Sequence, residues 1–266
     1  MNRIEKLFLN KKKNICSIYF TAGFPRLSDT TKICNALQKH GANLIEIGMP
    51  YSDPLADGPV IQHSSMKALH NGMSIKLLFD QLHNFLDTSP LGVGGIPLIL
   101  MGYLNPVLQY GIENFCRDAH NAGIDGIILP DLPLHEYETE YKAIFEKYNL
   151  HFIFLITPET SEDRIRSIDA LSSGFIYAVS SSSITGTEKN MAAQESYFKR
   201  LEEMHLKNPV MIGFGIKDHE TFLQACKHAA GAIIGTAYIK AIENSVDIEL
   251  DTAKFLNTIL QPSVIL

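Results

Sequence analysis

Short apolar runs alternate with amphipathic segments along almost the whole chain, and this alternation restricts the fold more than any other feature of the sequence. The apolar runs are too short for typical helices and are bounded by Gly, Pro or polar residues, which is typical of buried strands. About eight of them occur, at residues 15–21, 44–48, 97–101, 126–129, 151–156, 175–179, 209–212 and 230–234. Apolar residues at helical spacing follow most runs, so the sequence predicts repeated strand–helix units around a parallel sheet.

Two architectures accommodate such units, the open doubly wound sheet and the closed eight-stranded barrel. The length of 266 residues, the number of units and the absence of a GxGxxG motif after the first run favour the barrel. No linker separates the units. We therefore expect an α/β fold, with one (β/α)8 TIM-barrel domain over residues 1–266 and an extra amphipathic helix at residues 2–9.

Composition excludes several classes of partner. A net charge of −6 argues against nucleic-acid and membrane-surface binding, and no apolar run approaches the roughly 20 residues of a membrane span. The cysteines are spread widely without CxxC or Cys-His ligand spacing, so we expect reduced thiols in a cytoplasmic protein and no metal site; they are Cys16, Cys34, Cys116 and Cys226.

A carboxylate inside the second predicted strand is the strongest indication of chemistry. Glu46 lies in the run Leu44–Gly48, and an ionisable group in a strand buried on both faces costs several kcal/mol unless it is paired or lines a cavity. The loop after this strand carries Asp53 and Asp57. Acids from one strand and its loop suggest acid–base catalysis at the C-terminal end of the barrel.

Glycines follow the last two predicted strands. The segments Gly213-Phe214-Gly215 and Gly235-Thr236 occupy the loops that often bind phosphate in a barrel, through backbone N–H groups and a helix N-terminus. The alternative is that these glycines only allow the helices to pack. Two further choices stay open: the polar loop 180–189 is a lid or a flexible linker, and Tyr177 fills the core or lines a pocket.

Several motifs together resemble the tryptophan synthase alpha chain family, and the likeness extends over essentially the full length. The most specific is the segment Ile45 to Gln62, which contains Glu46 and Asp57. The others are Tyr103-Leu104-Asn105-Pro106, Leu129-Pro130-Asp131-Leu132-Pro133, Ile184-Thr185-Gly186, Gly213-Phe214-Gly215-Ile216 and Gly231-Ala232-Ile233-Ile234-Gly235.

The resemblance implies a barrel lyase that cleaves indole-3-glycerol phosphate to indole and glyceraldehyde 3-phosphate without a cofactor. Glu46 is then the general acid–base at C3 of the indole ring, and Asp57 accepts the indole N1–H and stabilises the cationic ring. The other implied site residues are Tyr19, Met101, Leu129, Tyr177, Thr185 and Phe214 for the rest of the substrate, and Gly186, Gly215, Gly235 and Thr236 for its phosphate. The implied partner is a beta chain that uses pyridoxal phosphate, in an alpha2beta2 complex.

Three positions differ from the commoner family pattern. Ser183 replaces a frequent Gly in the lid, Ile184 a frequent Val, and Thr236 a frequent Ser. Ser183 has less access to positive φ than Gly, so its effect on lid closure stays open. The alternatives to a complexed lyase are another phosphate-binding barrel enzyme such as a triose-phosphate-type isomerase, a free-standing indole-releasing lyase, and a non-catalytic regulatory subunit of a beta chain.

Overall fold

The computed structural model describes residues 1–88, 95–179, 188–213 and 215–262, without the side chains of 86–88 and 188–194. Within these residues nine strands form one sheet of parallel pairs, in the order β5-β4-β3-β2-β1-β9-β8-β7-β6. The strands are β1 (Ile15–Thr21), β2 (Leu44–Gly48), β3 (Leu98–Met101), β4 (Gly126–Ile128), β5 (His151–Phe152), β6 (Leu155–Ile156), β7 (Ile176–Val179), β8 (Val210–Gly213) and β9 (Gly231–Ile234).

The sheet closes on itself through the segment 151–156. The first half of this segment, β5, pairs with β4, and its second half, β6, pairs with β7. Between them the Ile153 N–H donates to the Ile127 carbonyl and the Phe154 carbonyl accepts from the Tyr177 N–H, both at 3.0 Å. The two ends of the strand order are therefore parts of one interrupted strand, and the predicted eight-fold barrel is confirmed.

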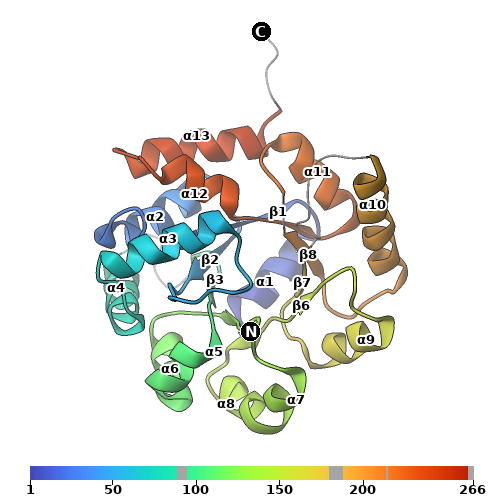
Figure 1. Ribbon diagram of the computed structural model, residues 1–266, viewed down its shortest axis with the longest axis horizontal. Coiled ribbons are helices and arrows are strands. Elements are labelled where there is room, and N and C mark those ends of the chain that lie inside the picture. The colour runs from blue at the N-terminus through green and yellow to red at the C-terminus, as the bar shows by residue number, and fades with distance from the viewer. Residues whose placement is uncertain (89–94, 180–187, 214, 263–266) are drawn as a thin grey trace.

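Helices surround the strands as an outer ring (Figure 1). They are α2 (Thr30–Lys39), α3 (Pro59–His70), α4 (Ile75–Thr88), α5 (Leu104–Tyr110), α6 (Ile112–Asn121), α7 (Leu134–Glu136), α8 (Lys142–Lys147), α9 (Glu162–Leu171), α10 (Glu188–Glu203), α11 (His219–His228), α12 (Thr236–Ile242) and α13 (Ile248–Leu260), whereas α1 (Arg3–Asn10) lies inside the ring. Short 3-10 and π-helical turns at Leu27–Asp29 and Tyr137–Tyr141 join this set.

Helices follow the strands as the alternation predicts, and one further helix was not expected. Helix α5 was not predicted, because Pro106 reads as a loop residue although it lies in the first turn, where a missing N–H is tolerated. A π-helical turn separates α7 from α8. A break also separates α3 from α4, where Ser74 Oγ accepts from the Leu77 N–H at 3.2 Å.

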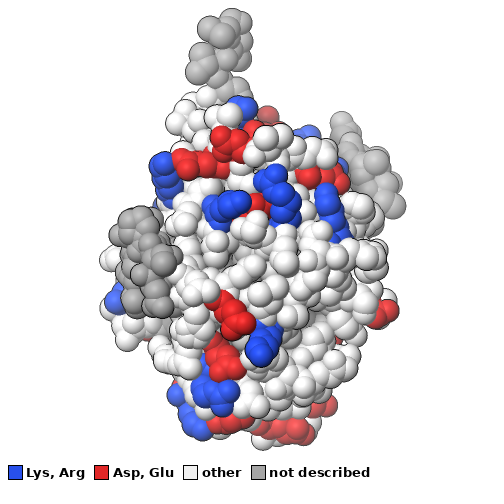
Figure 2. All heavy atoms as spheres, turned by 90° about the vertical axis from the view of Figure 1, so that its left-hand side faces the viewer, with Lys and Arg blue, Asp and Glu red and all other residues white. Residues whose placement is uncertain are grey.

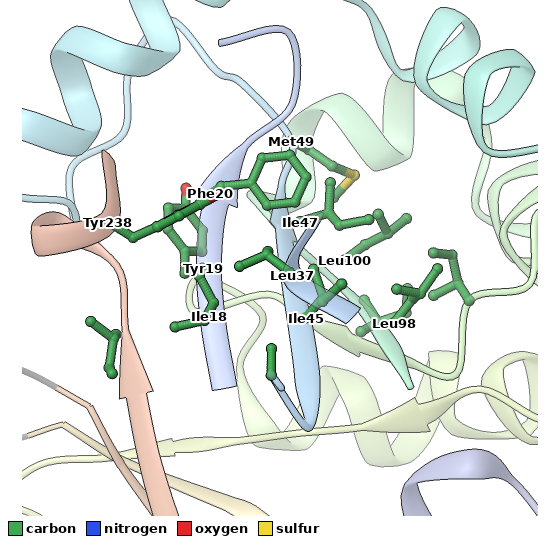
Figure 3. Packing of buried hydrophobic residues seen from close by; sticks show 14 of the residues in the cluster. Ile18, Tyr19, Phe20, Leu37, Ile45, Ile47, Met49, Leu98, Leu100 and Tyr238 are labelled. Atoms are coloured by element: carbon green, nitrogen blue, oxygen red, sulfur yellow. The ribbon is translucent and has the colours of Figure 1, made fainter. Parts of the chain in front are cut away.

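Successive side chains of each strand point alternately outward and inward, and this produces two apolar clusters. Outward residues of neighbouring strands pack against the helices, as Figure 3 shows for Ile45, Ile47 and Leu98 beside Leu37 of α2. Inward residues from all strands fill the barrel; these are Ile15, Leu44, Ile99, Ile128, Ile153, Phe175, Met211 and Ile233. The interior is therefore a packed core, as in other barrels of this kind.

The N-terminal helix covers the inward cluster. Ile4 and Phe8 of α1 belong to that cluster, and the Phe8 and Phe175 rings are 5.8 Å apart. Asn2 caps α1 and its side chain also donates to the carbonyls of Asp125 and Asn149. In Figure 1 this helix lies near the centre of the ring of helices. It is thus a plug at the end of the barrel where the strands begin.

An ion pair fastens this plug. Asp125, which is buried, accepts from the Leu98 N–H at 2.9 Å and forms an ion pair with Arg3 at 2.7 Å. The face shown in Figure 2 carries charges of both signs, with Lys and Arg interspersed with Asp and Glu. No helix in the described part of the chain is long and apolar enough to cross a membrane.

Replacing Asp125 should therefore destabilise the fold strongly. Asp125→Ala leaves the Arg3 cation and the Leu98 N–H without this acceptor, and we expect the free energy of unfolding in urea to fall by about 3 kcal/mol. Lys254→Ala is the control, because it removes an exposed Lys254–Asp251 pair whose loss should cost less than about 1 kcal/mol. Equal effects of the two changes would contradict this account of the plug.

Candidate active site

Glu46 lies in the interior of the barrel, on the central part of β2. It pairs in register with Tyr19 of β1 and Ile99 of β3, and its side chain is fully buried. Leu44, one layer below it on the same face, belongs to the inward apolar cluster. Strand alternation therefore places the carboxyl inside the barrel, as predicted, one layer before the C-terminal end of β2.

Only one oxygen of this carboxyl is paired within the described residues. Ser17 Oγ, also fully buried, donates to Glu46 Oε1 at 2.8 Å, while Glu46 Oε2 has no hydrogen-bond partner there. Burial raises the pKa of the Glu46 carboxyl from 4.5 to about 8, and the hydrogen bond from Ser17 acts in the opposite direction. At neutral pH Glu46 therefore carries a proton.

Two tyrosines lie close to Glu46, and two glycines make room for them. A Cβ added at Gly48 would lie 2.2 Å from the Tyr19 hydroxyl, and a Cβ added at Gly213 would lie 2.2 Å from the Tyr177 ring. Each glycine ends a strand, so each ring extends over the end of the neighbouring strand. Any larger residue at 48 or 213 would displace the tyrosine beside it.

Asp57 belongs to the loop between β2 and α3. The Tyr103 hydroxyl donates to Asp57 Oδ2 at 3.0 Å and accepts from the Ala56 N–H at 3.0 Å, so it holds both a side chain and the backbone of this loop. Burial raises the pKa of Asp57 above 3.8, and the hydrogen bond from Tyr103 opposes that rise. Asp53, in the same loop, is exposed and hydrogen-bonded to Ser52.

The tyrosines bring the two acids into one site. The charges of both Glu46 and Asp57 raise the pKa of Tyr19 and of Tyr177, in each case after the larger effect of burial. Both rings therefore lie within electrostatic range of both carboxyls. The sequence predicted the acids and these two tyrosines, but not the roles of Ser17 and Tyr103.

The predicted phosphate-binding residues lie at the ends of β8 and β9. Gly215 has φ +72°, a conformation that favours glycine, and space beside it is open. Thr236 is exposed and begins α12 directly after Gly235, so the unpaired N–H groups of the first helical turn lie at the end of β9. Gly235 also adjoins Tyr19, since a Cβ added there would lie 3.2 Å from the Tyr19 ring.

The other predicted site residues have different surroundings. Met101 ends β3 and is half-buried against both apolar clusters, whereas Leu129 is buried in the cluster between strands and helices. Thr185, Gly186 and Phe214 lie outside the described residues, as do Ser183 and Ile184. The assignment of the loop as a lid therefore stays a prediction.

This arrangement suits proton transfer to a bound molecule. One acid holds a proton inside the barrel, and a second acid lies in a half-buried loop, where it can stabilise positive charge. Backbone N–H groups at the end of β9, which is separated from β2 only by β1, can hold an anion. The arrangement is therefore suited to an anionic molecule that takes up a proton.

Comparison with known proteins identifies the family. A family model described as tryptophan synthase alpha chain matches residues 6–262. The tryptophan synthase alpha chain of Flavobacterium johnsoniae is 56% identical over 246 residues, covering 92% of this chain and 95% of the relative. That of Phocaeicola vulgatus is 52% identical over 262 residues, covering 98% of each chain.

The chain belongs to the tryptophan synthase alpha chain family. It is therefore a lyase of tryptophan biosynthesis, which cleaves indole-3-glycerol phosphate to indole and glyceraldehyde 3-phosphate. A solved tryptophan synthase alpha chain from Legionella pneumophila superposes with a TM-score of 0.85 at 33% identity, covering 97% of this chain and 95% of that chain. A tryptophan synthase structure from Mycobacterium tuberculosis in its aminoacrylate-bound form gives 0.83 at 27% identity, covering 97% and 100%.

The buried acid Glu46 should make the stability of the folded chain depend on pH. Because the folded pKa of Glu46 is about 8 and the ordinary value is 4.5, the folded state binds a proton between these values that the unfolded state releases. The free energy of unfolding of the wild type should fall across this window as pH rises. Glu46→Gln does not titrate there, so its stability relative to the wild type should increase by roughly 3 to 5 kcal/mol between pH 5 and pH 9.

Urea unfolding at several pH values tests this. The control is Glu138→Gln, an exposed glutamate, whose difference from the wild type should stay flat over the same range. A Glu46→Gln difference that is equally flat would show that Glu46 is not a proton-holding acid in the folded chain.

Proposed function

We propose that Glu46 and Asp57 are the catalytic acids of the lyase reaction. The observation that supports this most directly is the fully buried Glu46 carboxyl, protonated at neutral pH and with Oε2 unpaired among the described residues. Cleavage of the bond between indole C3 and the glycerol chain requires a proton on C3 first. Protonated Glu46 supplies it and becomes a carboxylate.

Asp57 acts on the charge that this step creates. Protonation of C3 places positive charge on the ring at N1, and the Asp57 carboxylate accepts the N1–H and stabilises that charge. Tyr103 holds this carboxylate by the hydrogen bond to Oδ2. The effect of burial on Asp57 is opposed by this bond, which favours the ionised form that the step needs.

The second proton transfer completes the cleavage. Ionised Glu46 takes the proton of the glycerol hydroxyl on the carbon bonded to C3. The O–H electron pair forms the aldehyde C=O, and the electrons of the breaking C–C bond return to the ring and neutralise it. Indole and glyceraldehyde 3-phosphate are released and Glu46 has its proton again, so the proposed reaction uses no cofactor.

The remaining proposed site residues position the substrate. Gly215, Gly235 and Thr236, with Gly186, bind the phosphate through N–H groups and a hydroxyl. The proposed walls of the indole and glycerol positions are Tyr19, Met101, Leu129, Tyr177 and Phe214, with Thr185 ordering Asp57. The geometry of Tyr19 and Tyr177 beside Glu46 supports two of these assignments.

We further propose that indole passes to a beta chain in an alpha2beta2 complex, with pyridoxal phosphate only in that partner. One structure similar to this chain is that of tryptophan synthase from Mycobacterium tuberculosis in its aminoacrylate-bound form. The exposed apolar residues Leu55 and Leu108 lie in the β2–α3 loop and on α5, at the barrel end that would meet the partner. Four buried free thiols support a reducing, cytoplasmic location.

The first test is indole release from indole-3-glycerol phosphate by the purified chain, with and without a beta chain. We expect slow release alone, much faster release with the beta chain, and at least a hundredfold loss of kcat in Glu46→Gln because the proton donor is removed. Glu138→Gln is again the control. Equally fast release without the beta chain would favour a free-standing lyase, and no release from the folded wild type would favour a regulatory subunit and refute the assigned catalytic roles.

A second test concerns Asp57. Tyr103→Phe removes the hydroxyl that holds this carboxylate, so kcat/KM for indole-3-glycerol phosphate should fall about tenfold, the loss of one hydrogen bond to a charged group. Tyr148→Phe is the matched control, since it removes a tyrosine-to-carboxylate hydrogen bond of 2.6 Å to Glu113 on the outer helices. An unchanged kcat/KM in Tyr103→Phe would show that Asp57 does not depend on this bond.

A further inference from the structure

Ser17 is a polar residue inside an otherwise apolar part of the barrel. It lies on the inward face of β1 between Ile15, a member of the inward cluster, and Tyr19. Its side chain is fully buried and its register partner on β2 is Leu44. A buried hydroxyl needs a hydrogen-bond partner, and that of Ser17 is the Glu46 carboxyl.

The contact is specific to one carboxyl oxygen. Ser17 Oγ lies 2.8 Å from Glu46 Oε1, and Oε2 lacks a partner within the described residues. A carboxyl held at one oxygen by a residue on the neighbouring strand has its plane restricted, and its other oxygen is left for a different group. Neither the acid motif nor any other motif of the sequence includes Ser17.

We propose that Ser17 is a positioning residue for the lyase reaction, which holds Glu46 Oε1 and thereby makes Oε2 the oxygen that exchanges protons with the substrate. This inference rests on the proposed role of Glu46. Ser17 itself contacts neither reacting atom. Its hydroxyl donates to Oε1 whether Oε2 carries a proton or not, so the orientation of the carboxyl persists through both proton transfers.

The same contact adjusts the acidity of Glu46. A hydrogen bond donated to a carboxylate favours the ionised form, and here it opposes the effect of burial on the pKa. Without the hydroxyl, Glu46 would hold its proton more tightly and in a less defined orientation. Both changes should slow proton transfer to C3, while substrate binding elsewhere in the site is unaffected.

The test is Ser17→Ala, assayed for indole release across pH with the beta chain present. We expect kcat to fall about tenfold with KM within about twofold, and the Glu46-dependent alkaline limb of kcat/KM to move up by about one pH unit, which is the effect of one hydrogen bond to a charged group. Ser17→Thr keeps the hydroxyl and should recover most of the activity and return the limb. Thr252→Val is the matched control, because it removes a buried hydroxyl bonded at 2.8 Å to Tyr238, apart from Glu46.

A titration of the free protein supplies a readout that does not require turnover. With carboxyl-13C-labelled glutamate, the resonance absent from Glu46→Gln reports Glu46, and its midpoint should be near pH 8 in the wild type and higher in Ser17→Ala. If Glu46→Gln abolishes turnover but Ser17→Ala leaves kcat, the limb and the midpoint unchanged, this inference is overturned and the proposed function stands. If Glu46→Gln remains active, both are overturned.

Discussion

Burial of the Glu46 carboxyl inside a closed barrel is the constraint on which the rest of the site depends. An ionised carboxylate there would cost several kcal/mol, so the group retains its proton to about pH 8. A pKa this high requires that water be excluded from the carboxyl both below and above it in the barrel. Below Glu46 the inward cluster and the α1 plug, fastened by Arg3 and Asp125, close the barrel. Above it the buried rings of Tyr19 and Tyr177 lie over the ends of β2 and β8. The plug is thus part of the environment that sets the acidity of Glu46, although it lies at the opposite end of the barrel.

The two acids differ in how deeply their carboxyl groups are buried. Burial raises the pKa of both, but Glu46 is fully buried with one hydrogen bond, whereas Asp57 is half-buried and bonded to Tyr103 at the barrel mouth. An acid and a carboxylate can therefore coexist at one pH, as proton donation to C3 and charge stabilisation at N1 require.

Much of the fold could be predicted, because strands buried on both faces leave an apolar signal and glycines mark their ends. Glu46 could be predicted for the same reason, since a charge in such a strand stands out. The contacts that join distant segments could not. Ser17 and Glu46 are 29 residues apart, and Arg3 and Asp125 are 122 apart, so nothing local in the sequence pairs them. Tyr103 appeared in the sequence as part of the motif Tyr103-Leu104-Asn105-Pro106, but nothing there paired it with Asp57. Helix α5 was missed because its Pro106 reads as a loop signal in isolation.

The contacts of Tyr19 explain how the proposed site can match a substrate with charge at one end. Its ring touches Gly235, next to the proposed phosphate position, and its hydroxyl lies against Gly48, directly above Glu46 on β2. Further along the same direction Tyr103 holds Asp57. The order across the mouth is thus phosphate donors, Tyr19, Glu46 and Asp57. Indole-3-glycerol phosphate has the corresponding order of phosphate, glycerol, C3 and N1, so anchoring the phosphate at α12 would bring C3 to the proton donor and N1 to the carboxylate.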